Sequence, residues 1–303
     1  MARSVQYEQF GGPEVLEVVE VPEPSAGPGQ IRVRVKAAAL NPVDYKIFHG
    51  GLVANAFGVV PPAGVGNDFS GVIDQVGEDV VGWAVGDEVF GSASDTMADY
   101  VVVPAAAPFR KPAGLSWEVA GSLGVVGPAA SASVASLHLT ESDTVLVSAA
   151  AGGVGVLAAQ LALATGAKVI GTASEANHEF LSSLGVVPVA YGEGLVDRLR
   201  AAAPQGLTAV LDNHGLEAVE AGLELGVPPG RINTIASYNG PEGINFVGGM
   251  NASRQDLEVL ANLIAEGGLQ LPIDSVFPLE SAGEAFARLE AGHVRGKVVL
   301  TTG

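Results

Sequence analysis

The residues with the clearest chemical meaning form one glycine-rich segment, Ala149-Ala150-Ala151-Gly152-Gly153-Val154-Gly155. It directly follows the apolar run TVLVS and leads into the run VLAAQLALA, whose spacing is helical. A pyrophosphate binds the backbone amides at the start of a helix, and small residues leave room for it. A glycine-rich turn without a ligand has the same composition, but the strand, turn and helix occur here in the order the motif requires. We therefore predict a dinucleotide site.

The end of the next predicted strand decides between NADH and NADPH. A carboxylate there would bind the ribose 2′-hydroxyl and repel a 2′-phosphate. The sequence reads VIGTAS and has no acid before Glu175, so NADPH is favoured over NADH. Ser174, His178 and Tyr191 are the candidates to contact the phosphate, and we identify no Arg or Lys beside them. In the alternative reading, His178 faces solvent and Tyr191 packs within its strand.

The full set of residues expected to bind the dinucleotide comprises the turn, the ends of the strands and one lysine of the C-terminal strand. They are Ala149, Gly152, Gly153, Val154, Gly155, Thr172, Ser174, His178, Tyr191, Asn213, Phe246 and Lys297.

Composition excludes several classes of partner and site. The chain has 303 residues, 33 acidic against 15 basic, and a formal charge of −18, which repels nucleic acid and anionic lipid. It has no cysteine, so thiolate nucleophiles, disulfides and Cys-ligated metals are impossible. The five histidines show no metal-binding spacing. We expect neither a nucleic acid partner nor a metal site.

The N-terminal residues lack an apolar run of signal-peptide length. Two uncharged stretches, 119–140 and 144–167, are each interrupted by Gly, Ser or Pro, and the second changes from strand to helix spacing. Buried elements explain these stretches better than membrane spans do. The sequence predicts a cytoplasmic protein with no membrane partner.

The order of elements predicts an α/β protein with two domains. Short β segments separated by turn signals fill the first third, which favours an irregular, mainly antiparallel domain. From about residue 116, predicted strands, which include INFVG at 244–248, alternate with helices, and this order predicts a doubly wound parallel sheet. The last segment again resembles the first third, so we expect it to complete that domain. The predicted domains are 1–118 with 268–303, and 119–267.

Six motifs together resemble the zinc-free quinone oxidoreductase branch of the medium-chain dehydrogenase/reductase superfamily. They are ALNPVDYK at 39–46, GNDFSGV at 66–72, VGDEV at 85–89, ADYV at 98–101, the turn at 152–155 and GKVVL at 296–300. The resemblance implies a GroES-like catalytic domain beside a Rossmann domain, a homodimer, NADPH, and hydride transfer in the cleft between the domains.

The resemblance also bears on zinc. Zinc alcohol dehydrogenases of this superfamily have Cys, His and Cys at the positions of Asn41, Asn67 and Val125. An amide is a weak zinc ligand and Val is none, so a catalytic zinc is not expected. Without it, the feasible reaction is hydride transfer to an electrophile that is already activated, such as a quinone or an α,β-unsaturated carbonyl.

The candidates to hydrogen-bond the substrate oxygen are Asn41, Tyr45 and Asn67. None is a strong acid, which suggests that the proton comes from water. The structural alternatives are turn roles for the two asparagines and wall packing for Tyr45. We expect Asp44 to pair with Lys297, whose ammonium could also face the cofactor phosphates.

The substrate class stays open between three functions. The first is reduction of quinones or enones. The second is reduction of the double bond of unsaturated carbonyls or enoyl thioesters. The third, favoured by Ala129 where the family often has Thr, is a dinucleotide-binding sensor or structural protein with little turnover.

Overall fold

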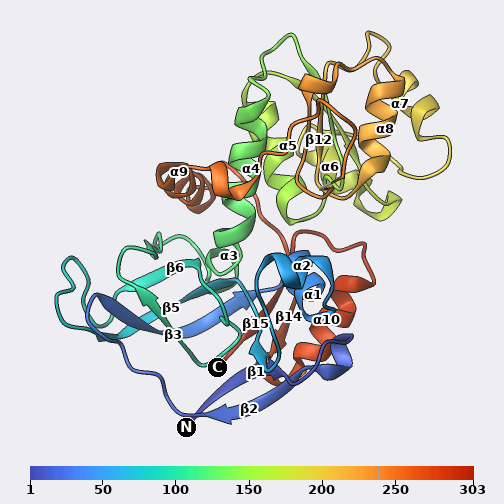
Figure 1. Ribbon diagram of the computed structural model, residues 1–303. Coiled ribbons are helices and arrows are strands. Elements are labelled where there is room, and N and C mark those ends of the chain that lie inside the picture. The colour runs from blue at the N-terminus through green and yellow to red at the C-terminus, as the bar shows by residue number, and fades with distance from the viewer. Residues whose placement is uncertain (238) are drawn as a thin grey trace. The chain divides into compact units, whose positions relative to one another are not determined.

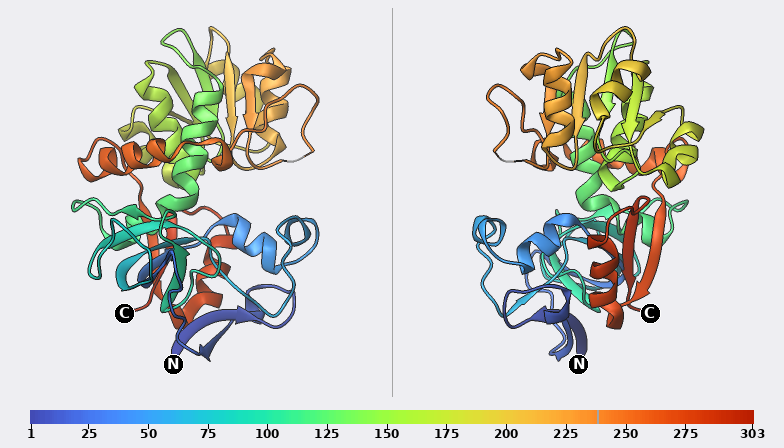
Figure 2. Two further views of the ribbon diagram at one scale, coloured as in Figure 1. Left: turned by 60° about the vertical axis from the view of Figure 1, so that its left-hand side comes forward. Right: turned by 90° about the vertical axis from the view of Figure 1, so that its right-hand side faces the viewer.

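The computed structural model describes residues 1–237 and 239–303 and divides into two compact units. Unit 1 comprises 1–125, 261–266 and 272–303, and unit 2 comprises 126–260 and 267–271. Figure 1 labels their elements and Figure 2 shows two further views. Helices α4 (Leu123–Ser136) and α9 (Arg254–Ala265) each have residues in both units.

Unit 1 is built on a sheet with the order β14-β15-β3-β5-β6-β8, with β7 paired to β3. These strands are β3 (Gln30–Ala39), β5 (Asp68–Val76), β6 (Glu88–Ser92), β7 (Tyr100–Pro104), β8 (Phe109–Arg110), β14 (Ile273–Pro278) and β15 (Lys297–Thr301). In β3 the side chains of Ile31, Val33 and Val35 are buried, which follows from the alternating sequence IRVRV. A smaller sheet has the order β2-β1-β4, from Glu17–Val21, Ala2–Tyr7 and Ala63–Gly64.

The C-terminal segment completes unit 1, as predicted. Strand β15 pairs antiparallel with β3, and β14 pairs parallel with β15 (Figure 2, red). The helices of this unit are α1 (Pro42–Phe48), α2 (Leu52–Ala56), α3 (Trp117–Ala120) and α10 (Ala282–Glu290), with short 3-10 turns at Pro13–Val15 and Leu279–Ser281.

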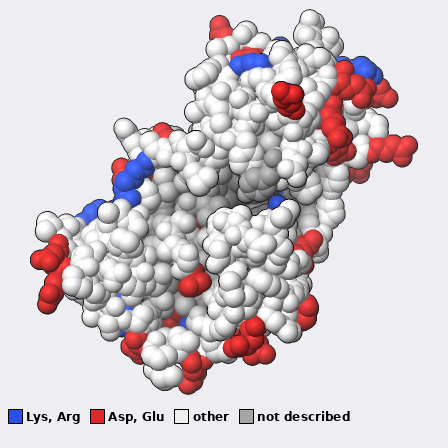
Figure 3. All heavy atoms as spheres, in the orientation of Figure 1, with Lys and Arg blue, Asp and Glu red and all other residues white. Residues whose placement is uncertain are grey.

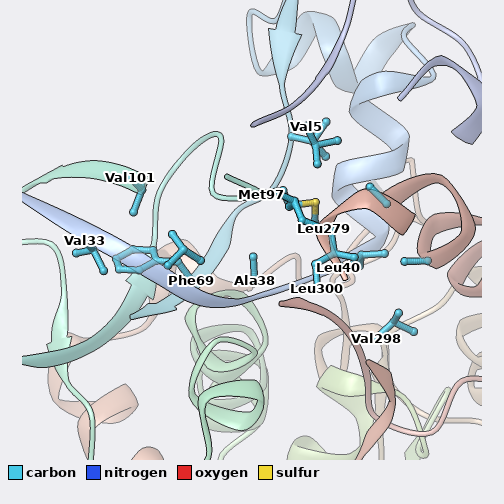
Figure 4. Close-up of a cluster of buried hydrophobic side chains, with 14 of the residues drawn as sticks. Val5, Val33, Ala38, Leu40, Phe69, Met97, Val101, Leu279, Val298 and Leu300 are labelled. Carbon is cyan, nitrogen blue, oxygen red and sulfur yellow. The ribbon is translucent and has the colours of Figure 1, made fainter. Parts of the chain in front are cut away.

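One apolar core ties these segments together. Side chains from β1, β3, β5 and β15, including Val5, Val33, Phe69 and Leu300, are fully buried in it, as is Leu40 directly after β3, at 1% exposed (Figure 4). Phe48 of α1 meets the C-terminal segment, because its ring lies edge-on to that of Phe286 with centroids 4.9 Å apart. The core therefore fixes α1 against α10.

Unit 2 contains a five-stranded parallel sheet with the order β11-β10-β9-β12-β13. Its strands are β9 (Thr144–Val147), β10 (Lys168–Thr172), β11 (Val187–Val189), β12 (Ala209–Asp212) and β13 (Ile232–Thr234). Its further helices are α5 (Gly153–Ala164), α6 (His178–Ser183), α7 (Leu195–Ala202) and α8 (Leu216–Glu224), with 3-10 turns at Glu175–Asn177, Pro229–Arg231 and Gly249–Asn251. The parallel order and the apolar strands confirm the predicted Rossmann arrangement.

Two local expectations differ from the structure. The segment INFVG, predicted as a strand, forms only a bridge between Asn233 and Asn245, because the side chain of Asn233 bonds both the N–H and the C=O of Val247. The first boundary between units lies after Val125 and not after residue 118, because Gly121 O accepts from Ala39 N of β3 and Val125 N donates to Asp68 Oδ1 of β5.

Candidate active site

The glycine-rich turn leaves the first amides of α5 without a side-chain cap. Gly152 occupies the N-cap position, and its carbonyl accepts from Val156 N at 2.9 Å. Ala149 has φ +46, and its N–H donates to Thr172 Oγ1 at 3.2 Å, which anchors the turn to β10. A phosphate needs uncapped amides of this kind at a helix start.

Gly155 allows the helix to approach the turn. A Cβ at this position would lie 2.1 Å from Ala149 O, closer than any side chain tolerates. The start of α5 therefore packs directly against the turn that follows β9, as a dinucleotide fold requires.

Behind the turn, polar side chains link the ends of three strands. Ser148 Oγ donates to Asp212 Oδ1 at 2.7 Å, and Thr234 Oγ1 donates to Asp212 Oδ2 at 2.6 Å. Asn213 bonds Ser148 twice, through N to Oγ at 2.7 Å and through Nδ2 to O at 3.0 Å. The sequence analysis did not identify Ser148, Asp212 and Thr234 as site residues. All three lie at the ends of apolar strands, and this shared position is the sequence feature that could have revealed them.

Asn213 Oδ1 is buried and has no hydrogen-bond partner among the described residues. Leaving a buried acceptor unsatisfied costs about 1–3 kcal/mol. A ligand N–H at this position would remove that cost. The turn and this oxygen together fit the dinucleotide that the sequence predicts.

The residues predicted for the adenosine end lie near the ends of β10 and β11. Thr172 is buried, and Ser174 Oγ accepts from Asn177 Nδ2 at 3.3 Å. The ring of His178 turns its Nε2 toward Ala173 O at 3.3 Å. Tyr191 is 44% exposed. Phe246, in the segment that pairs with β13 only through a bridge, is similarly exposed.

In unit 1, Asn41, Asp44, Asn67, Asp68 and Lys297 form one polar network. Asp44 accepts from Asn67 Nδ2 at 2.6 Å and from Asn41 N at 2.7 Å. Asn41 Nδ2 donates to Asp68 Oδ2 at 2.8 Å, and Lys297 Nζ donates to Asn41 Oδ1 at 2.5 Å. Four of the five residues are buried, and Asn67 is half-buried.

This geometry changes three of the sequence-based roles. Asn41 was expected to face the substrate, but it is 2% exposed and both atoms of its amide are engaged inside the network. Lys297 was expected to face phosphates, but it is 3% exposed. Its ion pair is with Asp68, at 3.5 Å, whereas Asp44 acts on it only through its charge.

Burial dominates the electrostatics of the network. It raises the pKa of Asp44 to about 6, against the hydrogen bonds from Asn67 and Asn41. Burial likewise raises the pKa of Asp68 and lowers that of Lys297, although each partner's charge opposes the shift. Two carboxylates share one ammonium, so the network holds a negative charge when all three groups are ionised.

Tyr45 follows Asp44 on α1 and is half-buried. Burial raises the pKa of its phenol, and the charge of Glu290 adds to the effect. The hydroxyl therefore stays protonated at neutral pH and is able to donate a hydrogen bond. Glu290 is held by His49, whose Nε2 lies 3.0 Å from Glu290 Oε1.

Family models match two parts of the chain. One, described as an alcohol dehydrogenase GroES-like domain, matches residues 27–113, and one described as a zinc-binding dehydrogenase matches residues 184–300. A solved quinone oxidoreductase from Coxiella burnetii is 32% identical, with TM-score 0.89, over 100% of this chain and 99% of that chain. The chain belongs to the medium-chain dehydrogenase/reductase superfamily. Within it, the chain is a quinone oxidoreductase-like enzyme.

Two further members of the superfamily concern cofactor and substrate. A mycobacterial protein solved as a complex with NADPH is 25% identical, with TM-score 0.85, over 99% of this chain and 100% of that chain. An Arabidopsis thaliana protein named NADPH-dependent alkenal/one oxidoreductase is 28% identical and aligns with 97% of this chain and 78% of its own length.

The zinc position of this superfamily is filled differently here. Asn41 and Asn67 use their amides within the network, and the N–H of Val125 donates to Asp68 Oδ1 at 2.7 Å. Nowhere in the described ranges do three His, Cys, Asp or Glu side chains gather in a way that could hold a metal ion. The donor set does not fit a catalytic zinc, and the ammonium of Lys297 supplies the positive charge in this network.

No helix within residues 1–237 and 239–303 has the length and apolar character that a membrane crossing requires. On the face drawn in Figure 3, acidic side chains outnumber basic ones, as the formal charge of −18 leads one to expect.

Proposed function

We propose that this protein is an NADPH-dependent, zinc-independent reductase that transfers hydride to a quinone or a related enone. The observation that carries the proposal is the pair of donors on unit 1, Asn67 and Tyr45, beside a buried charged network that offers no metal ligand set. Such donors suit a substrate that is already electrophilic, because it needs only orientation and stabilisation of the oxygen that gains charge.

NADPH, when bound, supplies the hydride. The open amides of residues 153–155, at the start of α5, would hold its pyrophosphate. Ser174, His178 and Tyr191 would meet the adenosine end. The buried Oδ1 of Asn213 would accept a hydrogen bond from the bound molecule. NADH would meet the same turn but would lack the 2′-phosphate.

Asn67 would donate one amide hydrogen to the substrate oxygen. Its other N–H is held by Asp44 at 2.6 Å, which fixes the orientation of the amide. Asn41 and Lys297 would then act as positioning residues, because they hold Asp68 and the start of α1 in place. Tyr45 would supply a second neutral donor.

A quinone that accepts a hydride must also gain a proton to become a hydroquinone. The exposed parts of Tyr45 and Asn67 allow water to reach the substrate oxygen, and water supplies this proton in our scheme. Neither side chain needs to lose a proton, in keeping with the raised pKa of Tyr45.

Double-bond reduction of unsaturated carbonyls is the second candidate. It is favoured by the similarity to the alkenal/one oxidoreductase and would use the same donors on an enolate oxygen. From the family resemblance and the acidic charge, we further propose a cytoplasmic homodimer without a nucleic acid partner. Light scattering after size-exclusion chromatography tests the dimer.

The deciding experiment follows NADPH and NADH oxidation against naphthoquinones, benzoquinones, enals and enones. We expect turnover with NADPH and quinones, and Tyr45→Phe to lower kcat about tenfold. Turnover confined to enals or enones would select the second candidate. Binding of NADPH without turnover on any substrate would instead support the sensor function.

A variant in the glycine-rich turn tests whether this turn binds the cofactor. Gly153→Asp places a carboxylate at the start of α5 and is expected to abolish NADPH binding while the circular dichroism spectrum stays unchanged. Retained affinity would show that the turn has a structural role only.

A further inference from the structure

The guanidinium of Arg198, on α7, holds the segment 190–193 that follows β11. It donates to four successive carbonyl oxygens: Nε to Ala190 at 2.9 Å, Nη2 to Tyr191 at 3.2 Å and Gly192 at 3.0 Å, and Nη1 to Glu193 at 2.8 Å. Four bonds from one side chain fix the path of this segment and thereby the place from which Tyr191 projects.

The charge of Arg198 is solvated by these carbonyl groups and is not neutralised by an acid. Across the described residues, no carboxylate oxygen lies within ion-pair distance of it, whereas Arg200 on the same helix pairs with Asp197 at 2.9 Å and Glu224 at 3.6 Å. Carbonyl groups carry no net charge, so their hydrogen bonds to the guanidinium do not cancel its positive charge. Arg198 therefore places a positive charge at the segment that follows β11.

The sheet brings that charge to the adenosine end of the proposed cofactor site. Strands β10 and β11 are parallel, with Thr172 opposite Val189, and Ala173 N donates to Val189 O at 3.1 Å. Ser174 and Tyr191 each lie two residues beyond this pair. The segment held by Arg198 consequently leaves the sheet beside the strand end that distinguishes NADPH from NADH.

We propose that Arg198 is a specificity-determining residue, which holds segment 190–193 in place and supplies the positive charge that favours a 2′-phosphate at the end of β10. The proposal rests on the proposed NADPH dependence. It would explain how a protein of charge −18, whose only basic residue at positions 174–178 is His178, binds the 2′-phosphate of NADPH.

An acid opposes Arg198 at the same segment. Glu217 Oε1 accepts from Gly192 N at 2.7 Å, so a carboxylate also lies at segment 190–193. The cofactor preference then depends on the balance of these two charges. Removing either charge should move the preference, in opposite directions.

The test compares dissociation constants of NADPH and NADH by calorimetry for wild type, Arg198→Gln and Arg200→Gln. We expect Arg198→Gln to weaken NADPH binding about five- to tenfold and to leave NADH unchanged, since the lost charge acts on the 2′-phosphate alone. Arg200→Gln removes the same charge from the same helix, where it is already paired, and should change neither constant.

Two further variants separate charge from support. Arg198→Lys keeps the charge but forms fewer carbonyl bonds, so it should retain most of the preference for NADPH. Glu217→Gln should tighten NADPH about threefold without affecting NADH. If Arg198→Gln does not fold, Arg198→Lys and Glu217→Gln still test the proposal.

If Arg198→Gln weakened the binding of NADPH and NADH equally, Arg198 would have a structural role only, and the proposal would be overturned. An unchanged ratio in Arg198→Gln and Glu217→Gln would overturn it as well. If wild type binds neither cofactor, it is the proposed function that fails.

Discussion

Asn67 Nδ2 and Asp44 Oδ1 are joined by a hydrogen bond of 2.6 Å between a half-buried amide and a fully buried carboxylate. If the amide turned over, its oxygen would face the carboxylate, and the repulsion of two acceptors prevents this. In the proposed mechanism, Asp44 thus decides which atom of the Asn67 amide is presented to a substrate, although its own side chain is buried.

Asp44→Asn should remove this control. We expect kcat to fall about tenfold with little change in KM, because the amide is then free to present either atom to the developing charge. The wild-type rate should rise with pH through about 6, where Asp44 loses its proton and becomes the stronger acceptor, and the variant should lack that rise. Steady-state kinetics from pH 5 to 8 measure both effects.

The matched control is Asp79→Asn, which removes an exposed carboxylate of the same unit. It should leave kcat and its pH profile unchanged. Identical pH profiles for wild type and Asp44→Asn would show that Asp44 does not position Asn67.

Asp44 should also make the free energy of unfolding depend on pH. Its pKa is raised from 3.8 to about 6 in the folded protein, so between these values the folded state binds more protons than the unfolded state. Stability from this group is therefore highest near pH 4 and falls as pH rises to 6, by about 3 kcal/mol. Urea denaturation of wild type and Asp44→Asn from pH 4 to 7 isolates the effect, since the variant gains stability relative to wild type over that window. A constant difference between the two proteins would refute it.

Lys297→Met should destabilise unit 1 strongly. The ammonium is the cation that faces Asp68, whose side chain is fully buried, and its removal leaves that carboxylate unpaired. We expect a loss of about 3–5 kcal/mol in the free energy of unfolding. Lys46→Met, at an exposed position of α1, should cost less than 1 kcal/mol and serves as the control in the same urea titration. A small loss at Lys297 would mean that Asp68 is protonated in the folded protein.

Much of the fold follows from local patterns in the sequence. TVLVS followed by a glycine turn and an apolar helix predicts β9 and α5, and alternation in IRVRV predicts the buried face of β3. These patterns succeed because burial acts on neighbouring positions. The strand predicted at INFVG fails because Asn233 takes over the backbone bonds of Val247, which no periodicity reveals.

The polar site is harder to predict, since its contacts join distant positions. Asn41 and Lys297 are 256 residues apart, and only the sheet that pairs β15 with β3 brings them together. Residue type alone marked Asn41 as a donor to substrate, whereas its burial directs both amide atoms inward. For the same reason Arg198 escaped notice: in sequence it lies beyond Tyr191, and only the fold turns it back onto that segment.

The His178→Lys substitution should strengthen the preference for NADPH. The ring already turns toward the end of β10, where its Nε2 lies 3.3 Å from Ala173 O, so a lysine at this position reaches the same region with a permanent charge. We expect NADPH to bind about fivefold more tightly and NADH to bind as before. Introduced into Arg198→Gln, the same change should restore the lost preference, because the two cations act on one phosphate. Calorimetry of the single and double variants measures this, and a double variant that stays as weak as Arg198→Gln would place the two residues at different parts of the cofactor.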